Sequence, residues 1–128
     1  MIKSTLYVGI GGFFGAILRY EISRHIKERR QIIIPIETFI INVLGSFLLN
    51  FLSSPKINVN LDDDVKLFLT TGFLGAFTTY STFSHETIDL IKNKKYFQAF
   101  KYMSLTIIFG LIGGVLGYYI GNCVGNLI

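Results

Sequence analysis

The stretch from Leu67 to His85 constrains this chain most, because it lacks acidic, lysine and arginine side chains yet makes a poor continuous helix. Gly72 and Gly75 lie inside it, and a string of Thr and Ser residues follows them. Lipid cannot satisfy the backbone groups that a helix break frees, so a break at membrane depth must be packed in protein or line a polar path for an ion. The stretch therefore predicts a broken helix at the functional centre of a small membrane protein.

Composition also indicates a membrane protein. Apolar residues make up 51% of the chain, charged residues 16%, and the mean hydropathy is +0.53. The net charge of +4 does not indicate a nucleic-acid partner, because Lys and Arg fall between apolar segments, as they do in loops that flank membrane spans. No linker or change of composition divides the 128 residues, so we expect a single domain.

Four membrane spans are expected, at about residues 4–23, 32–53, 65–90 and 97–121. The first is uncharged through Leu18 and then contains Arg19 and Glu21. Pro35 lies near the start of the second, where a helix tolerates proline. The joining loops are short, which predicts antiparallel neighbours in a bundle. The expected fold is thus all-α, with four transmembrane helices of which the third is broken.

Glycines repeat every four residues in the first and last spans, at Gly11, Gly15, Gly113, Gly117, Gly121 and Gly125. This spacing puts small residues on one helical face, where helix backbones can approach closely. A dinucleotide loop does not explain them, because Phe14 breaks the required spacing and no strand precedes it. The single Cys123 and the absence of a Cys/His cluster give no support for a catalytic metal site, and we expect no enzyme.

Polar side chains inside the spans carry the functional argument. Asn42 lies one helical turn after Thr38 and can serve either as an interhelical hydrogen-bonding group or as a donor to a passing ion. Arg19 must reach the membrane surface or pair with Glu21 or a neighbouring carbonyl. Glu86 follows the broken segment and is either an exposed loop acid or a group at a pore mouth.

The lining that these residues offer suits a small, hard anion. No ring of acids marks a cation path, and no ring of Lys or Arg marks a bulk anion pore. Hydroxyl and amide hydrogens are donors, and aromatic ring edges carry partial positive charge. Several such weak sites allow conduction where a full countercharge would bind too tightly. The candidate groups are Thr38, Asn42, Phe77, Thr79, Tyr80, Ser81, Thr82 and Phe83.

Three motifs on three successive spans, at residues 12–20, 38–45 and 72–84, carry a resemblance to a known family. In these motifs and along essentially its whole length, the chain resembles the Fluc/CrcB family of fluoride channels. The resemblance implies a passive, fluoride-selective channel in the cell membrane, of the bacterial inner-membrane type, that exports cytoplasmic fluoride and relieves its toxicity. It also implies an antiparallel dimer, in which one subunit is inverted relative to the other and two narrow pores form.

The resemblance implies roles for individual residues as well. A structural sodium ion would lie on the dimer axis, bound by the backbone carbonyls of Gly75 and Thr78. The pore would be lined by the Asn42 amide, the ring-edge pair Tyr80 and Phe83, and the hydroxyls of Ser81, Thr82 and Thr106, with Glu86 near a mouth; Arg19 and Thr38 would be structural. The family usually has Phe at the position of Tyr80, whose added hydroxyl can either donate to fluoride or obstruct it.

Two rival functions follow from the chain's size and expected topology. A small four-helix drug/proton antiporter needs a buried acid in its first span, whereas residues 1–18 contain none and Glu21 lies near the span end. A non-conducting packing subunit of a heterodimeric channel is the second rival. That rival predicts that Asn42 and Phe83 are dispensable, whereas a channel requires them.

Charge placement predicts how the chain inserts. Eight basic residues flank the first and third loops, and three lie on the opposite side with both termini and the second loop; the eight are Arg24, Lys27, Arg29, Arg30, Lys92, Lys94, Lys95 and Lys101, and the three are Lys3, Lys56 and Lys66. Basic residues near span ends favour the cytoplasm, so both termini should lie outside. An antiparallel homodimer needs one sequence to insert both ways. The bias therefore predicts a heterodimer with a paralogue of opposite charge bias.

Overall fold

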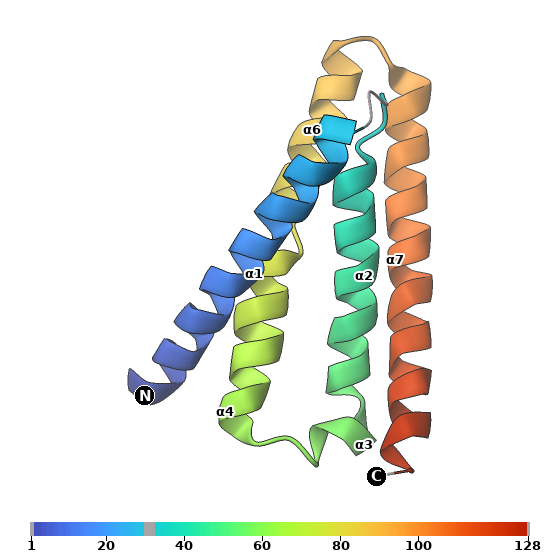
Figure 1. Ribbon diagram of the computed structural model, residues 1–128. Coiled ribbons are helices and arrows are strands. Elements are labelled where there is room, and N and C mark those ends of the chain that lie inside the picture. Colours follow the sequence, from blue (N-terminus) through green and yellow to red (C-terminus); the bar gives the residue numbers. More distant parts are fainter. Residues whose placement is uncertain (1, 30–32, 128) are drawn as a thin grey trace.

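The computed structural model describes residues 2–29 and 33–127, and every regular element in these ranges is helical. Longer helices alternate with short helical elements, and Figure 1 shows their arrangement. The long helices are α1 (Ile2–Arg29), α2 (Ile36–Ser53), α6 (Tyr80–Lys92) and α7 (Tyr96–Gly125). The short elements are α3 (Pro55–Asn58), α4 (Asp63–Lys66), the π-helix η1 (Leu67–Leu74) and α5 (Gly75–Phe77).

The helices pack as two pairs. α2 runs beside α7 along most of its length, whereas α1 crosses η1 and α5 at an angle (Figure 1). In both pairs glycine allows the close approach: a Cβ at Gly117 of α7 would collide with the Phe47 carbonyl of α2, and one at Gly15 of α1 with the Phe73 carbonyl of η1. The glycine repeat therefore marks helix packing, as its spacing predicts.

The third expected span is broken, as predicted, but its first half is not an α-helix. The chain winds as a π-helix from Leu67 to Leu74, makes one short turn over Gly75–Phe77, and resumes as α6 at Tyr80. Between these pieces Thr78 and Thr79 are extended, with ψ angles of 151° and 113°. The break thus falls just after the glycines that predict it.

The other helix bounds differ modestly from expectation. α1 continues to Arg29, and its 28 residues span about 42 Å at 1.5 Å per residue, which is longer than a bilayer core of about 30 Å. α2 begins at Ile36, directly after Pro35, because proline is favoured at a helix start. The beginning of the expected second span, residue 32, lies outside the described residues.

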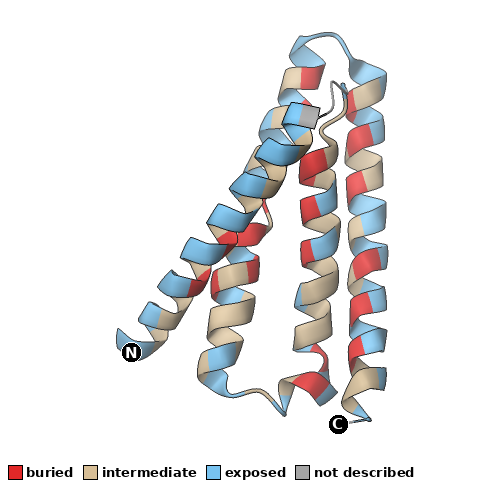
Figure 2. Ribbon diagram, in the orientation of Figure 1, coloured by how far each residue is buried: buried red, intermediate tan, exposed pale blue. Residues whose placement is uncertain are grey.

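Many large apolar side chains are exposed. Figure 2 shows that exposed positions lie along the whole length of α1 and α7. Along α7 the exposed set includes Ile107, Ile108, Leu111, Val115 and Tyr119. Of the helices described, α2 and α7 are long and apolar enough to cross a membrane by themselves. α1 carries charges toward its end, and the third segment is divided into shorter pieces.

The two ends of the bundle contain different parts of the chain. Both ends of the described chain and α3 lie at one end, and the connections α1–α2 and α6–α7 lie at the other (Figure 1). At the first end Lys3 Nζ lies 2.6 Å from Asp64 Oδ2, which ties the start of α1 to α4. The hydrogen bond to this carboxylate raises the pKa of Lys3.

Candidate functional site

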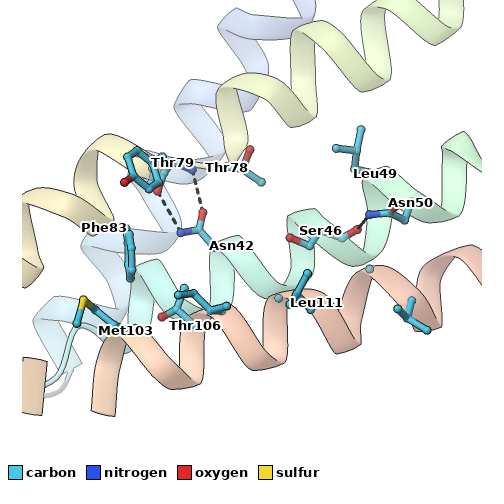
Figure 3. A pocket seen from close by; sticks show the side chains of 15 residues that line it. Asn42, Ser46, Leu49, Asn50, Thr78, Thr79, Phe83, Met103, Thr106 and Leu111 are labelled. Carbon is cyan, nitrogen blue, oxygen red and sulfur yellow. Dashed lines mark hydrogen bonds between the residues drawn. The ribbon is translucent and has the colours of Figure 1, made fainter. Parts of the chain in front are cut away.

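The break after α5 is held by one side chain from another helix. Asn42 of α2 accepts a 2.8 Å hydrogen bond at Oδ1 from the Thr79 N–H and donates one of 3.1 Å from Nδ2 to the Thr79 carbonyl (Figure 3). The amide therefore satisfies both backbone groups of the extended residue. One hydrogen on Nδ2 still remains for another partner, because an amide nitrogen carries two.

Thr79 also begins the next helix. Its Oγ1 accepts a 3.2 Å hydrogen bond from the Thr82 N–H, which is the usual bond of a helix N-cap, and donates to Thr82 Oγ1 at 2.9 Å. The Ser81 Oγ lies 3.3 Å from the same Thr79 Oγ1. Three hydroxyls thus cluster at the start of α6; Thr79 is buried, Thr82 half-buried and Ser81 exposed.

Arg19 fixes the break from the other side. Its Nε donates a 3.1 Å hydrogen bond to the Ala76 carbonyl. Of the partners that the sequence allows for Arg19, the structure therefore shows a neighbouring carbonyl. Glu21 instead pairs with Arg24 at 2.7 Å. A Cβ at Gly45 of α2 would collide with the Thr78 methyl group, so α2 also packs directly on the break.

The break leaves the Gly75 carbonyl without its usual helical donor. In a continuous helix that carbonyl would accept from the Thr79 N–H, which here donates to Asn42. Gly75 is exposed on the surface of the subunit, and Thr78 is half-buried. Backbone carbonyl oxygens are hard ligands of the kind that alkali and alkaline-earth cations prefer, so the chemistry of these groups suits a cation.

A hollow of about 760 Å³ lies beside the break, between α2, α6 and α7 (Figure 3). Its wall is mostly apolar, with an amide and hydroxyls placed among aromatic and aliphatic side chains. It is lined by Asn42, Ser46, Leu49, Asn50, Thr78, Thr79, Tyr80, Phe83, Met103, Thr106, Ile107, Gly110, Leu111, Gly114 and Val115. Such a surface offers weak donors without a full charge.

The hollow brings together only some of the residues that the sequence and the family resemblance single out. Asn42, Tyr80, Phe83 and Thr106 line it, whereas Ser81, Thr82 and Glu86 lie outside its lining. The Thr106 hydroxyl is already used, because it donates to the Tyr102 carbonyl at 2.8 Å.

Sequence reasoning missed Ser46 and Asn50, which line the hollow one turn apart on α2. Asn50 Nδ2 donates to the Ser46 carbonyl at 2.9 Å. The four-residue spacing from Asn42 through Ser46 to Asn50 puts all three on one face, and this was the signal available.

Aromatic rings connect the hollow with the loop end of the bundle. The Tyr80 and Phe83 centroids are 5.9 Å apart, and Phe83 is 5.2 Å from Tyr102. The Tyr102 hydroxyl donates a 2.9 Å hydrogen bond to Glu86 Oε2. Tyr80 itself is 81% exposed, so the ring pair expected at a pore lies on the surface of the single subunit.

A cluster of charged groups adjoins Glu86. Lys27 Nζ lies 3.3 Å from Glu37 Oε1 and 3.8 Å from Glu86 Oε1. Thr38, expected to be structural, is buried and interacts through its hydroxyl with Glu86 and Tyr102. Glu86 is therefore an internal, partnered acid, and the exposed-loop reading of this residue is wrong.

Comparison with known proteins places this geometry in a family. Residues 6–118 match the family model described as CrcB-like protein, Camphor Resistance (CrcB). The chain is 44% identical over 121 residues to the fluoride-specific ion channel FluC 2 of Bacillus cereus, covering 94% of this chain and 99% of that protein.

Two further relatives bear the same description. The fluoride-specific ion channel FluC 1 of Listeria monocytogenes is 43% identical over 121 residues, covering 94% of this chain and 99% of that protein. The fluoride-specific ion channel FluC of Methanococcus aeolicus is 40% identical over 121 residues, covering 94% of each chain. With most of its length matched at this identity and a helix break at the motif, the chain belongs to the CrcB-like family of multi-pass membrane channels.

Proposed function

We propose that this chain forms a passive, fluoride-specific ion channel that lets cytoplasmic fluoride leave across the cell membrane. The observation that carries the proposal is the hollow beside the break, where the Asn42 amide, hydroxyls and ring edges converge without a lysine or arginine in its lining. A small anion can bind weakly to such donors and leave again. An inside-negative membrane assists export by about 2.3 kcal/mol per charge per 100 mV.

The residue roles proposed for transport follow from placement. Asn42 would donate to fluoride through its second Nδ2 hydrogen, and Tyr80 and Phe83 would present ring edges. Ser81 and Thr82 would supply hydroxyls along the start of α6, and Thr106 of α7 would supply another once it released the Tyr102 carbonyl, to which it donates here. Glu86 would lie at the end of this path, where Tyr102 donates to it.

A second, inverted subunit would complete the site. Tyr80 and Ser81 are exposed at the break, although backbone freed at membrane depth must be covered by protein or water. A second copy of the same surface, turned over in the bilayer, would cover both breaks and bring four carbonyls together. A sodium ion bound by the carbonyls of Gly75 and Thr78 from each subunit would satisfy the groups that the break leaves open.

The inverted subunit is proposed to be a paralogue. The eight-to-three distribution of basic residues favours one orientation, with both ends of the chain outside. Single cysteines placed at the exposed Asn60 of the second loop and at the exposed Asn93 of the third, in a Cys123→Ser background, report the two sides of the membrane. We expect an impermeant thiol reagent to label only the Asn60 position in intact cells. Equal labelling at both positions would contradict the heterodimer.

Fluoride flux from proteoliposomes tests the channel itself. A fluoride electrode should record rapid efflux from vesicles that contain the chain, alone or with its paralogue, and chloride should be retained. Vesicles that hold fluoride as well as protein-free ones, in every subunit combination, would reject the proposal. Flux that persists in both the Asn42→Ala and Phe83→Ala variants would instead favour a packing subunit.

A further inference from the structure

Lys27 reaches over two nearly buried carboxylates at the loop end of the bundle, the upper end of Figure 1. The Glu37 side chain is 10% exposed and that of Glu86 is 13% exposed, whereas Lys27 is 58% exposed. The three groups come from α1, α2 and α6, so the contact joins helices far apart in sequence. Their combined charge is about −1 when all three are ionised.

Two acids withdrawn from water to this extent need a counter-charge, because an unpaired buried carboxylate is strongly disfavoured. Lys27 provides it to both. Glu86 is further held by the Tyr102 hydroxyl at 2.9 Å, and the Tyr102 ring contacts Phe83, which lines the hollow. The charge cluster is therefore one aromatic contact away from the proposed anion path.

We propose that Lys27 is a positioning residue for anion passage, which cancels part of the charge of Glu37 and Glu86 and holds Glu86 against Tyr102. Without it, two carboxylates at the end of the path would repel the arriving anion. Glu37 takes part by competing for the same ammonium group, so its charge sets how much of Lys27 remains for Glu86. The inference rests on the proposed function. It assigns a role in anion passage to Lys27, which lies outside the lining of the hollow.

Variants that neutralise or keep the charge of Lys27 test its proposed role in the fluoride-efflux assay. We expect Lys27→Gln to slow efflux roughly five- to tenfold, the size of effect that one uncompensated charge near the path produces at intermediate dielectric. Lys27→Arg keeps the charge and should remain within about twofold of wild type. Lys27→Gln combined with Glu37→Gln restores the original net charge and should recover most of the lost rate.

Ionic strength separates a charge effect from a packing effect. In Lys27→Gln the position of the largely exposed ammonium group becomes open to solvent cations, so the deficit should shrink when potassium sulfate is raised to high concentration, whereas a packing defect would not respond. Wild-type rates in Lys27→Gln, or a double variant that folds and stays as slow as the single one, would overturn the inference.

The Glu37→Gln variant covers the case in which Lys27→Gln does not fold. It leaves Lys27 in place and removes one negative charge, so efflux should rise above wild type; an unchanged or slower rate would overturn the inference. Wild-type efflux itself is the separate control, because its absence rejects the proposed channel, whereas the ratios between variants test Lys27 alone.

Discussion

The α2–α7 pair and the segment from η1 to α6 both contain Gly and Phe but reach different structures. α7 stays helical for 30 residues, while the other segment, in which Thr and Ser are concentrated, breaks at Thr78 and Thr79. The glycines of α7 repeat every four residues and meet the backbone of α2. Gly72 and Gly75 are three apart, and the two extended threonines, Thr78 and Thr79, follow Gly75 after two intervening residues. The spacing of the glycines and the hydroxyl residues that follow them therefore separate the break from the packing region.

A second difference is where the polar side chains find their partners. The hydroxyls of Thr106 and Thr87 donate to carbonyls four residues earlier in their own helices, which leaves those helices intact. At the break the backbone groups of Ala76 and Thr79 find partners in other helices, in Arg19 of α1 and Asn42 of α2. External hydrogen bonds replace those that a continuous helix would make, and they stabilise the extended residues.

Gly117→Val should cause the largest loss, because it attacks the packing region directly. The added side chain would collide with the Phe47 carbonyl, a backbone atom that cannot move aside cheaply, and we expect a cost of about 3 kcal/mol or more. Recovery of monodisperse protein and the thermal unfolding midpoint measure it. Gly110→Ala is the matched control, since a Cβ there meets its nearest atom at 3.9 Å. Equal yields for the two variants would contradict the packing described.

Gly75→Val tests the break as an assembly surface. Inside the single subunit a Cβ at this position meets only the Thr70 carbonyl, at an ordinary 3.7 Å, so the chain itself should fold. We expect the dimer and the flux to be lost, because a β-branched side chain would disturb the carbonyl and crowd the axis. Cross-linking and light scattering in detergent report assembly. A normal dimer with full flux would mean that the proposed cation site is wrong.

Asn42→Ala should weaken the break without destroying the bundle. It leaves the N–H and carbonyl of the buried Thr79 unpaired, at a cost of about 1–3 kcal/mol for each group. We expect fluoride efflux to fall by roughly tenfold or more, as a loss of about 1.4 kcal/mol already gives tenfold. Asn50→Ala is the comparison, because its amide bonds within its own helix and should matter less to the unfolding midpoint. Similar shifts for both would argue against a bracing role of Asn42.

Thr78→Ser should have the smallest effect. The hydroxyl that donates to the Leu74 carbonyl at 2.9 Å remains, and the proposed sodium ligand is the backbone carbonyl. Only the methyl group packed on Gly45 is removed, worth about 1 kcal/mol. Flux and dimer content should stay near wild type, and a large fall in either would show that the side chain itself is needed.

The sequence predicts the break well because its signals are local. Glycines followed by hydroxyl residues in an uncharged run are visible in the sequence alone, and the approximate positions of the long helices, though not their ends, follow from hydropathy. Contacts between distant segments were less accessible. The pairing of Asn42 with Thr79, which lie 37 residues apart, and that of Lys27 with Glu37 and Glu86 depend on how the helices cross. The π-helix was missed because its composition is that of an α-helix.

That π-helix sets the register of everything after it. Its hydrogen bonds join residues five apart instead of four. Each turn over Leu67–Leu74 therefore contains more residues than a turn of α-helix. If the same residues wound as an α-helix, at 3.6 residues per turn, the chain after them would leave the segment at a different rotation about the helix axis. The Ala76 carbonyl would then turn away from Arg19, and Thr79 away from Asn42. Winding this segment as an α-helix would thus misdirect the break while leaving each of its residues present.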